Sequence, residues 1–229
     1  MERQEIRCRD CMVKSIPAGK LNVQELNMLS SNCARISFRK GENIIKQGAF
    51  TTNIVYIKSG LVKEHMRGPN GKDEIMKLTK GPAYIGVASA LGGRIHQYSC
   101  TALEPCSVCF VDLRVFHDLL LTNPYFSREL ILNMSRDLLE HFTRCINKTQ
   151  KQLHGVLAET LLYLSDSIYG SDSFNLSLTR AELAAMVGTT RETVTRILHD
   201  YTENGMISIK GKKIKIMNRE MLQKISVNG

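Results

Sequence analysis

The segment Thr190-Arg-Glu-Thr-Val-Thr-Arg-Ile-Leu198 holds the side chains with the clearest chemistry. Its apolar residues recur at helical spacing and predict one buried face. The opposite face suits the edges of DNA bases. Arginine can donate two hydrogen bonds to guanine, glutamate can accept one from cytosine, and threonine can contact a base edge or the thymine methyl group. The candidate base-reading residues are therefore Arg191, Glu192, Thr195 and Arg196.

The residues just before this segment predict a helix-turn-helix. Thr179 followed by Glu182 is a capping box, which opens a helix. Gly188 would end that helix at a tight turn, and Thr189 with Glu192 would form a second capping box. In helix-turn-helix proteins the N-terminal end of the second helix enters the major groove. The base-reading candidates lie at that end.

A basic hairpin is predicted directly after the second helix. Met206–Lys210 and Lys212–Ile216 read as two strands joined at Gly211, with lysines in and around the turn. The Arg and Glu residues alone would also fit an ordinary solvated helix face. The hairpin favours DNA binding, because a basic wing in this position can contact phosphates. The candidate backbone-contacting residues are Thr179, Thr189, Thr190, Lys210, Lys212 and Lys213.

The seven cysteines allow other chemistry. Cys8 and Cys11 form a Cys-x-x-Cys pair, which could bind a metal or act as a redox pair. A thioredoxin-like enzyme would place that pair where a strand meets a helix, whereas here it lies in a short polar N-terminal segment. We therefore expect no enzyme. Without a signal peptide or a membrane span, we expect a cytoplasmic protein whose thiols are reduced.

Two kinds of element must position these residues. From about Arg35 to Leu113 short strands alternate with glycines, which predicts a β-barrel or sandwich. The predicted strand segments are 36–38, 43–45, 54–57, 61–62, 73–78, 99–102 and 107–111. From Pro124 a long helix follows, without Gly or Pro until Gly155.

Apolar residues recur along this helix at heptad spacing. They predict a dimer seam, although a helix packed on its own barrel would be the alternative. The seam candidates are Leu132, Leu139, Phe142, Ile146 and Leu153. Gly155 would interrupt the helix and act as a hinge.

These motifs together resemble the CRP/FNR superfamily of bacterial regulators, more closely its FNR branch than its cyclic-AMP branch. The similar segments are Thr190–Leu198, the wing turn at Gly211, His154–Leu164, Lys40-Gly-Glu42, Gln47-Gly48 and Ile57–Val62. The resemblance implies an α+β fold, with an N-terminal double-stranded β-helix or jelly-roll barrel (1–122), a dimerisation helix (123–154) and a C-terminal winged helix-turn-helix (155–229). It also implies inverted-repeat DNA sites and three partners: double-stranded DNA, a second copy of the chain and RNA polymerase.

The sequence leaves three possibilities for the effector. Cyclic AMP is disfavoured, because Ile85–Leu91 and Gln97–Cys100 lack the phosphate-binding residues of that branch. By resemblance Cys8, Cys11 and Cys109 match positions of iron–sulfur ligands. A cluster takes four thiolates, and Cys33, Cys100, Cys106 or Asp10 would have to complete the set. The third possibility is another ligand, including haem on His65, His96 or His117, an organic metabolite or a direct thiol switch.

Overall fold

The computed structural model describes residue 11 and residues 14–229, apart from the side chain of residue 228. By internal contacts the chain divides into two units. The first comprises Met1–Met66 with Leu78–Leu139, and the second comprises Arg67–Lys77 with Glu140–Gly229. Among the described residues, no helix is long and apolar enough to cross a membrane.

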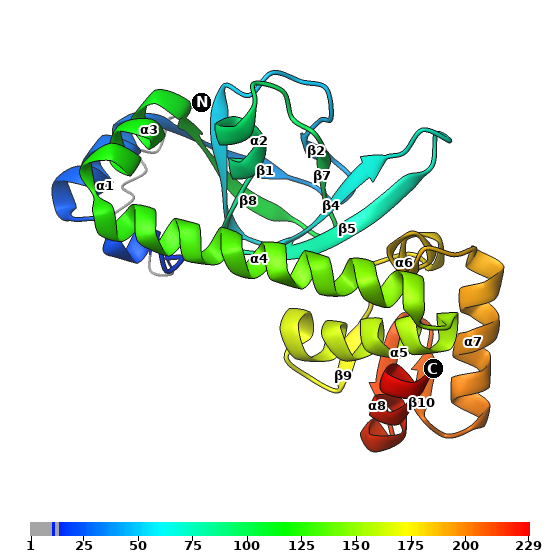
Figure 1. Ribbon diagram of the computed structural model, residues 1–229. Coiled ribbons are helices and arrows are strands. Elements are labelled where there is room, and N and C mark those ends of the chain that lie inside the picture. The colour runs from blue at the N-terminus through cyan, green and yellow to red at the C-terminus, as the bar shows by residue number, and fades with distance from the viewer. Residues whose placement is uncertain (1–10, 12–13) are drawn as a thin grey trace. The chain divides into compact units, whose positions relative to one another are not determined.

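Two antiparallel sheets form a barrel (Figure 1), whose strands belong to the first unit apart from the strand residues within 67–77. One sheet has the order β1 (Cys33–Phe38), β8 (Cys106–Asp112), β3 (Asn53–Ser59), β6 (Ala83–Ile85). The other has the order β2 (Asn43–Ile45), β7 (Ser99–Ala102), β4 (Leu61–Arg67), β5 (Asp73–Lys80). Val55, Val62 and Val108 meet in the core between the sheets. The predicted barrel is confirmed.

Helices cover one side of the barrel and form a second core. They are η2 (Ala18–Lys20), α1 (Val23–Ser31), α2 (Val87–Gly92), α3 (Leu113–Thr122) and the start of α4 (Pro124–Gln150). Phe116 and Phe126 pack edge to face with ring centroids 5.5 Å apart, against Ile54 of β3. The Asn123 side chain accepts a hydrogen bond from the Phe126 backbone N–H and so starts α4. This packing fixes the first turns of α4 on the barrel.

The long helix ends earlier than the sequence predicted. It stops at Gln150, and α5 (Leu153–Tyr163) begins after Gln152, whose backbone is extended. The break therefore lies at residues 151–152 and not at Gly155, which is buried in the first turn of α5. Leu153, assigned to the seam, also belongs to α5. Glycine fits this position because the backbone of Gly229 lies against it and leaves no room for a Cβ atom.

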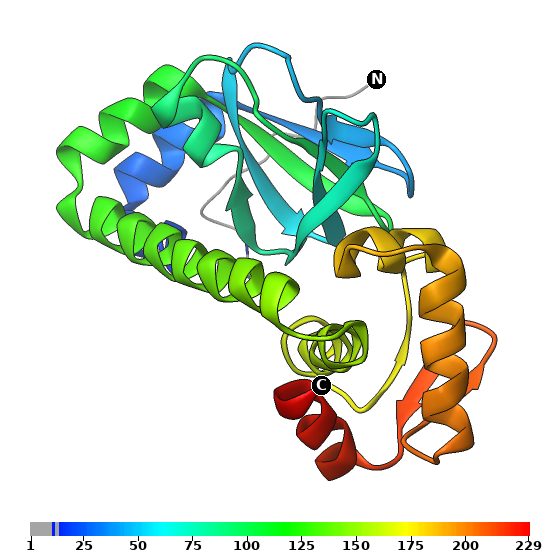
Figure 2. The ribbon, with the colours of Figure 1, turned by 45° about the vertical axis from the view of Figure 1, so that its right-hand side comes forward.

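The second unit contains a small sheet and five helical segments beyond α4. After α5 come the π-helix η3 (Leu164–Tyr169), β9 (Ser173–Asn175), α6 (Arg180–Val187), α7 (Arg191–Glu203), β10 (Ile207–Lys210), β11 (Lys213–Ile216) and α8 (Arg219–Asn228). The sheet order is β10-β11-β9. Figure 2 shows α8 lying against α5 and the β10–β11 hairpin lying beside α7. Together these elements make the predicted winged helix-turn-helix.

Candidate nucleic-acid interface and effector pocket

Helix α6 and the turn that follows it are set by local signals. The Thr179 hydroxyl accepts from the Glu182 backbone N–H, and the Glu182 carboxylate accepts from the Thr179 N–H. Gly188 then takes a φ of +85°, which favours glycine. Both features agree with the sequence prediction.

The start of α7 differs by one residue from the prediction. Its N-cap is Thr190, whose hydroxyl accepts from the Thr193 backbone N–H at 3.2 Å. The predicted capping box of Thr189 with Glu192 is therefore wrong. The cap needs an extended backbone, and Thr190 has it, with φ −93° and ψ 157°. Glu192 lies in the first turn instead, where hydrogen bonds from its own backbone N–H and from the Thr190 hydroxyl lower the pKa of its carboxyl.

The two faces of α7 are separated as the sequence predicted. Val194, Ile197 and Leu198 are buried. The outward residues up to His199 are Arg191, Glu192, Thr195, Arg196 and His199. His199 extends this face by one turn and was passed over in the sequence, because a single histidine gives no pattern of its own.

Two of the outward side chains already have partners within α7. The Thr195 hydroxyl donates to the Arg191 carbonyl oxygen at 2.8 Å, which leaves the methyl group and the remaining acceptor capacity of the hydroxyl for other contacts. Arg196 forms an ion pair with Asp200 at 3.5 Å, and its side chain remains 63% exposed. A pair this exposed contributes little to stability.

Helix α7 is held in place at its buried side. The Tyr201 hydroxyl donates to the His154 carbonyl oxygen at 2.5 Å, which connects α7 to the start of α5. Burial raises the pKa of Tyr201, so its hydroxyl stays protonated and remains a donor. The outward face of α7 thus lies on a helix that is anchored to α5, and not on a loop.

The wing hairpin places its lysines outward. Ile207 pairs with Ile216 and Lys210 with Lys213, so the turn consists of Gly211 and Lys212. Gly211 has a φ of +61°. Ile207, Ile214 and Ile216 are buried beneath the hairpin. The exposed cations are Lys210, Lys212, Lys213 and Lys215.

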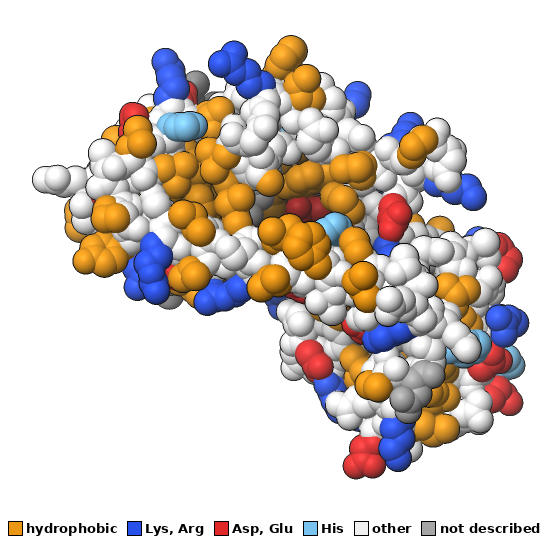
Figure 3. All heavy atoms as spheres, in the orientation of Figure 1, with side chains coloured by type: hydrophobic (Ala, Val, Ile, Leu, Met, Phe, Trp, Pro, Cys, Tyr) orange, Lys and Arg blue, Asp and Glu red, His pale blue; other side chains and the backbone are white. Residues whose placement is uncertain are grey.

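An apolar stripe lies exposed along α4. Leu139, Phe142 and Ile146 are 65%, 55% and 54% exposed, and Figure 3 shows hydrophobic side chains along this helix. Ile131 and Leu138 are exposed as well and widen the stripe by one position. Leu132 is half-buried. The exposed apolar stripe is therefore broader than the heptad spacing predicted.

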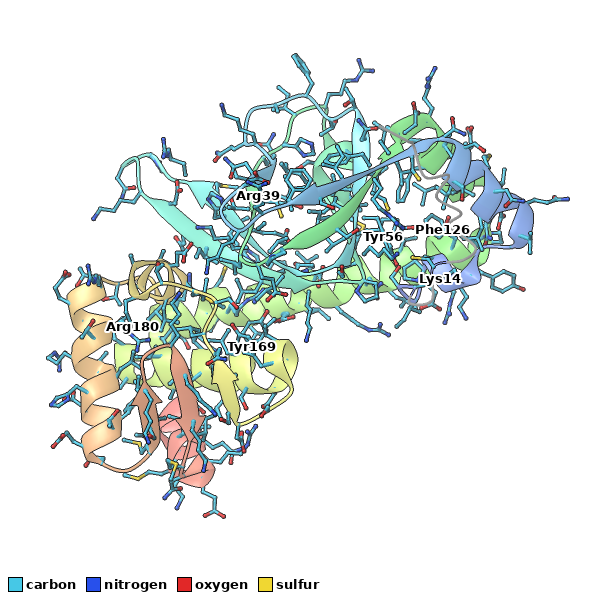
Figure 4. All side chains as sticks on the ribbon, turned by 180° about the vertical axis from the view of Figure 1, so that it is seen from behind. Lys14, Arg39, Tyr56, Phe126, Tyr169 and Arg180 are labelled. Atoms are coloured by element: carbon cyan, nitrogen blue, oxygen red, sulfur yellow. The ribbon has the colours of Figure 1, made fainter. Side chains whose placement is uncertain are left out.

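Cysteines gather at a pocket on the outer side of the sheet β1-β8-β3-β6. Its empty volume is about 510 Å³ with open solvent included, and its lining includes Cys11, Cys33, Cys109, Lys14 and Tyr56. Lys14 and Tyr56 are labelled in Figure 4. Cys109 and Tyr56 face each other across β8 and β3. The structure thus brings Cys11 and Cys109 to one place, whereas Cys8 lies outside the described residues.

The interior of the barrel contains a buried acid that the sequence analysis missed. Glu64 on β4 is only 8% exposed and accepts a hydrogen bond from the Thr79 hydroxyl. It lies opposite Cys100, whose side chain belongs to the core between the sheets. Burial raises the pKa of Tyr98, and the nearby charge of Glu64 raises it further. An inward carboxylate could have been found from the alternation of β4, in which Glu64 follows Val62 by two positions.

Comparisons with known proteins agree with these two units. Residues 35–123 match the family model of the cyclic nucleotide-binding domain, and residues 157–225 match that of the Crp-like helix-turn-helix domain. The chain belongs to the CRP/FNR superfamily.

Among relatives of this CRP/FNR chain, the fumarate and nitrate reduction regulatory protein of Escherichia coli K12 is 26% identical, covering 96% of this chain and 90% of its own. Electron transport regulator A of Shewanella oneidensis is also 26% identical, with 97% and 91% covered. The structure of FixK2 from Bradyrhizobium japonicum has the same fold, with a TM-score of 0.78, 20% identity, and 86% of this chain and 98% of that chain covered. The sequence relatives support the FNR side of the superfamily over the cyclic-AMP side, whereas the likeness to FixK2 shows the fold.

The described residues do not complete an iron–sulfur site in this CRP/FNR chain. In the part of the chain that the structure describes, no group of three or more His, Cys, Asp or Glu side chains could hold a metal ion. Cys100 and Cys106 face the barrel interior, so neither can serve as a fourth ligand beside Cys109. Cys33 lines the same pocket as Cys11 and Cys109 without forming such a group. Asp10 and Cys8 lie outside the described residues.

The histidines considered for haem lie on three different segments of the chain. His65 is hydrogen-bonded to Thr101 on β7 at 2.9 Å. His96 is buried, and burial lowers the pKa of its imidazole. His117 is exposed on α3. The structure does not single out one of them as a haem ligand.

Proposed function

We propose that this chain is a homodimeric transcription regulator, and not an enzyme, that reads an inverted-repeat operator with α7 and responds to a signal at its barrel. The observation that carries the proposal is the polar face of α7, with Arg191, Glu192, Thr195 and Arg196 exposed over a buried apolar side. Base-edge contacts need side chains of these types at the N-terminal end of a recognition helix. Such a regulator works on chromosomal DNA in the cytoplasm, with RNA polymerase as a further partner.

The exposed stripe on α4 supports the homodimer. An exposed row of Leu139, Phe142 and Ile146 would be unfavourable in water and fits a helix that pairs with its copy. Two copies related by a twofold axis would present two α7 helices to two half-sites about one DNA turn apart. The helix break at residues 151–152, together with the nearby Gly155, would form a hinge. Through this hinge a signal at the barrel would reach the DNA-binding unit.

Selection from random DNA tests the operator proposal. Purified protein is mixed with a randomised duplex library, and the bound fraction is sequenced after several rounds. We expect an inverted repeat whose half-sites are centred about 10 base pairs apart. Enrichment of a single unrepeated motif would contradict binding as a dimer, and no enrichment over input would contradict sequence-specific binding.

A second candidate is an oxygen, redox or nitrosative-stress sensor that uses an iron–sulfur cluster or haem. The proximity of Cys11 and Cys109 favours it over an organic ligand, although the described residues do not complete a cluster site. The ultraviolet–visible spectrum of protein purified without oxygen distinguishes the cases. A broad absorption that bleaches in air indicates a cluster, a sharp Soret band indicates haem, and iron analysis of the same sample checks both.

A further inference from the structure

We propose that Asp200 is a positioning residue for base reading, which orients the guanidinium group of Arg196 toward the DNA bases. The inference deepens the proposed function and rests on it for every statement about DNA. The effect of Asp200 on the motion of Arg196 can also be measured on the free protein.

One oxygen of the Asp200 carboxylate lies between two side chains that can carry a positive charge. Its Oδ2 atom accepts from Nη1 of Arg196 at 3.5 Å and lies 3.7 Å from Nε2 of His154. Arg196 belongs to the outward face of α7, whereas His154 belongs to the first turn of α5. Asp200 therefore connects the candidate base-reading arginine with a second helix.

The position of Asp200 beside His154 is fixed by the residue that follows it. Tyr201 is buried, and its hydroxyl donates to the His154 carbonyl oxygen at 2.5 Å. The rings of Tyr201 and His154 also pack edge to face, with centroids 6.2 Å apart. The backbone of α7 at Asp200 is thus anchored to the start of α5, and the carboxylate stays within reach of Arg196.

The geometry of the guanidinium group gives this contact a function. The N–H donors of arginine lie in a rigid planar fork. Pairing through Nη1 leaves the edge formed by Nε and Nη2, which can donate two hydrogen bonds to O6 and N7 of guanine. Asp200 lies one turn behind Arg196, as seen from the end of α7 that would enter the major groove. A carboxylate there limits the rotation of the guanidinium and directs its free edge toward the bases.

Helix stability does not explain an acidic residue at this position. Asp200 lies in the last turn of α7, where a negative charge is unfavourable with the helix dipole. The side chains of Arg196 and Asp200 are 63% and 40% exposed, and such a pair contributes little to stability. Close to DNA, the phosphates would also repel the carboxylate. A residue with these costs and a contact to Arg196 fits a role in orienting that side chain.

The base discrimination of an Asp200→Ala variant tests the proposal. The operator selected from random DNA and its single-base variants are titrated by fluorescence anisotropy, and Arg196→Ala shows which base position depends on Arg196. At that position we expect Asp200→Ala to reduce the preference for the operator base by roughly two- to fivefold, which corresponds to the energy of an exposed ion pair. The preferences at the other positions should not change.

A matched variant separates positioning from the loss of a negative charge. Glu203→Ala removes another acid from the last turn of α7, whose side chain is 69% exposed, and should leave the preference at the Arg196 position unchanged. In an Arg196→Ala background, Asp200→Ala should cause no further loss, because a residue that acts through Arg196 then has no side chain to position. Urea unfolding checks the stability of each variant, and Asp200→Asn gives the same test if the alanine variant is unstable.

The free protein provides a readout that needs no DNA. Nitrogen relaxation measured by NMR at the Arg196 Nε–H group reports the motion of the guanidinium, and Asp200→Ala should increase that motion. Arg219, which pairs with Asp166 and Asp172, is the internal reference and should not change. Unchanged motion of Arg196 would overturn the proposal.

The binding data distinguish failure of this proposal from failure of the regulator proposal. Full discrimination by Asp200→Ala, an equal loss in Glu203→Ala, or a further loss in the Arg196→Ala background would overturn the positioning role while operator binding stands. A gain in discrimination would also overturn it, because Asp200 would then keep Arg196 away from the bases. If the unaltered protein selects no operator, the regulator proposal fails and the positioning role fails with it.

Discussion

Gly155 lies directly against the backbone of Gly229, so that a Cβ atom on residue 155 would come within 2.8 Å of the Gly229 carbonyl carbon. Helix α8 packs along α5, and the contact between Gly155 and Gly229 lies where the end of α8 meets the start of α5. The glycine in the first turn of α5 thus has a packing reason, in addition to any role as a hinge.

Replacing Gly155 with alanine should destabilise the protein by roughly 1–3 kcal/mol, the usual cost of forcing an extra group into a packed site. If the residue were only a flexible hinge in a helix, alanine would instead stabilise it by about 0.5–1 kcal/mol. Urea unfolding distinguishes the two signs. Gly92→Ala is the control, because a Cβ there meets nothing within 4 Å. Stabilisation by Gly155→Ala would contradict the packing account.

If Arg196 reads a base, removing its side chain should reduce the discrimination between the operator and sequences that differ at that base. Arg196→Ala should weaken binding to the selected operator by roughly 1–3 kcal/mol and relax the base preference at one position of each half-site. Fluorescence anisotropy against the operator and its single-base variants measures both effects. Lys224→Ala removes another exposed cation, on α8, and serves as the control. Equal losses on operator and random DNA would show that Arg196 contacts only the backbone.

The lysines of the wing hairpin should raise the affinity for DNA of any sequence and should not affect the preference for the operator. Lys212 stands in the exposed turn of the hairpin, where it is suited to a phosphate. Lys212→Ala should weaken binding to operator and random DNA by similar factors and reduce the slope of log K against log salt by about 1 for each phosphate that the wing no longer neutralises. Titrations between about 50 and 200 mM salt measure this slope. An unchanged slope would remove the wing from the interface.

The sequence was sufficient for elements whose signals are local. Turn glycines and alternating apolar residues located β2 and β7 with their actual bounds, 43–45 and 99–102. The Thr179–Glu182 box and Gly188 located α6 in the same way. Helices α1, α2 and α3 and strand β6 were not predicted. They are short, and their apolar residues bury against distant segments, as when Leu29 of α1 packs with Phe116 of α3.

The candidate site residues also fall into two groups, those that local sequence patterns predict and those that only distant contacts bring together. The faces of α7 and the wing follow from helical and hairpin periodicity within a few dozen residues. The pocket of Cys11 and Cys109 depends on the Ser15–Tyr56 hydrogen bond, between residues 41 positions apart, and no local pattern encodes it. The resemblance to the FNR branch pointed to both cysteines, whereas only the fold showed that Cys100 and Cys106 face the other way.

The barrel should not bind cyclic AMP. A cyclic phosphate entering the interior would meet the buried Glu64 carboxylate, and two negative charges of this kind repel strongly away from water. We therefore expect no rise in Tm with millimolar cyclic AMP, whereas ligand at 100 times its Kd would stabilise the protein by about 2.7 kcal/mol. The operator duplex, added to the same sample, is the positive control. A cyclic-AMP-dependent shift would contradict this interpretation of the barrel.

The dimer should depend on the stripe of α4. Leu139 is its most exposed central residue, and a lysine there would place a charge within an apolar contact between two copies. Leu139→Lys should give a monomer in sedimentation-velocity experiments at micromolar protein, with its circular dichroism unchanged. Asp137→Lys places the same side chain at another exposed position of α4, outside the heptad seam, and should leave the dimer intact. Because each monomer would hold one α7, the Leu139→Lys protein should bind a single half-site and the full inverted repeat with similar affinity. A Leu139→Lys protein that still sediments as a dimer would show that the copies meet elsewhere.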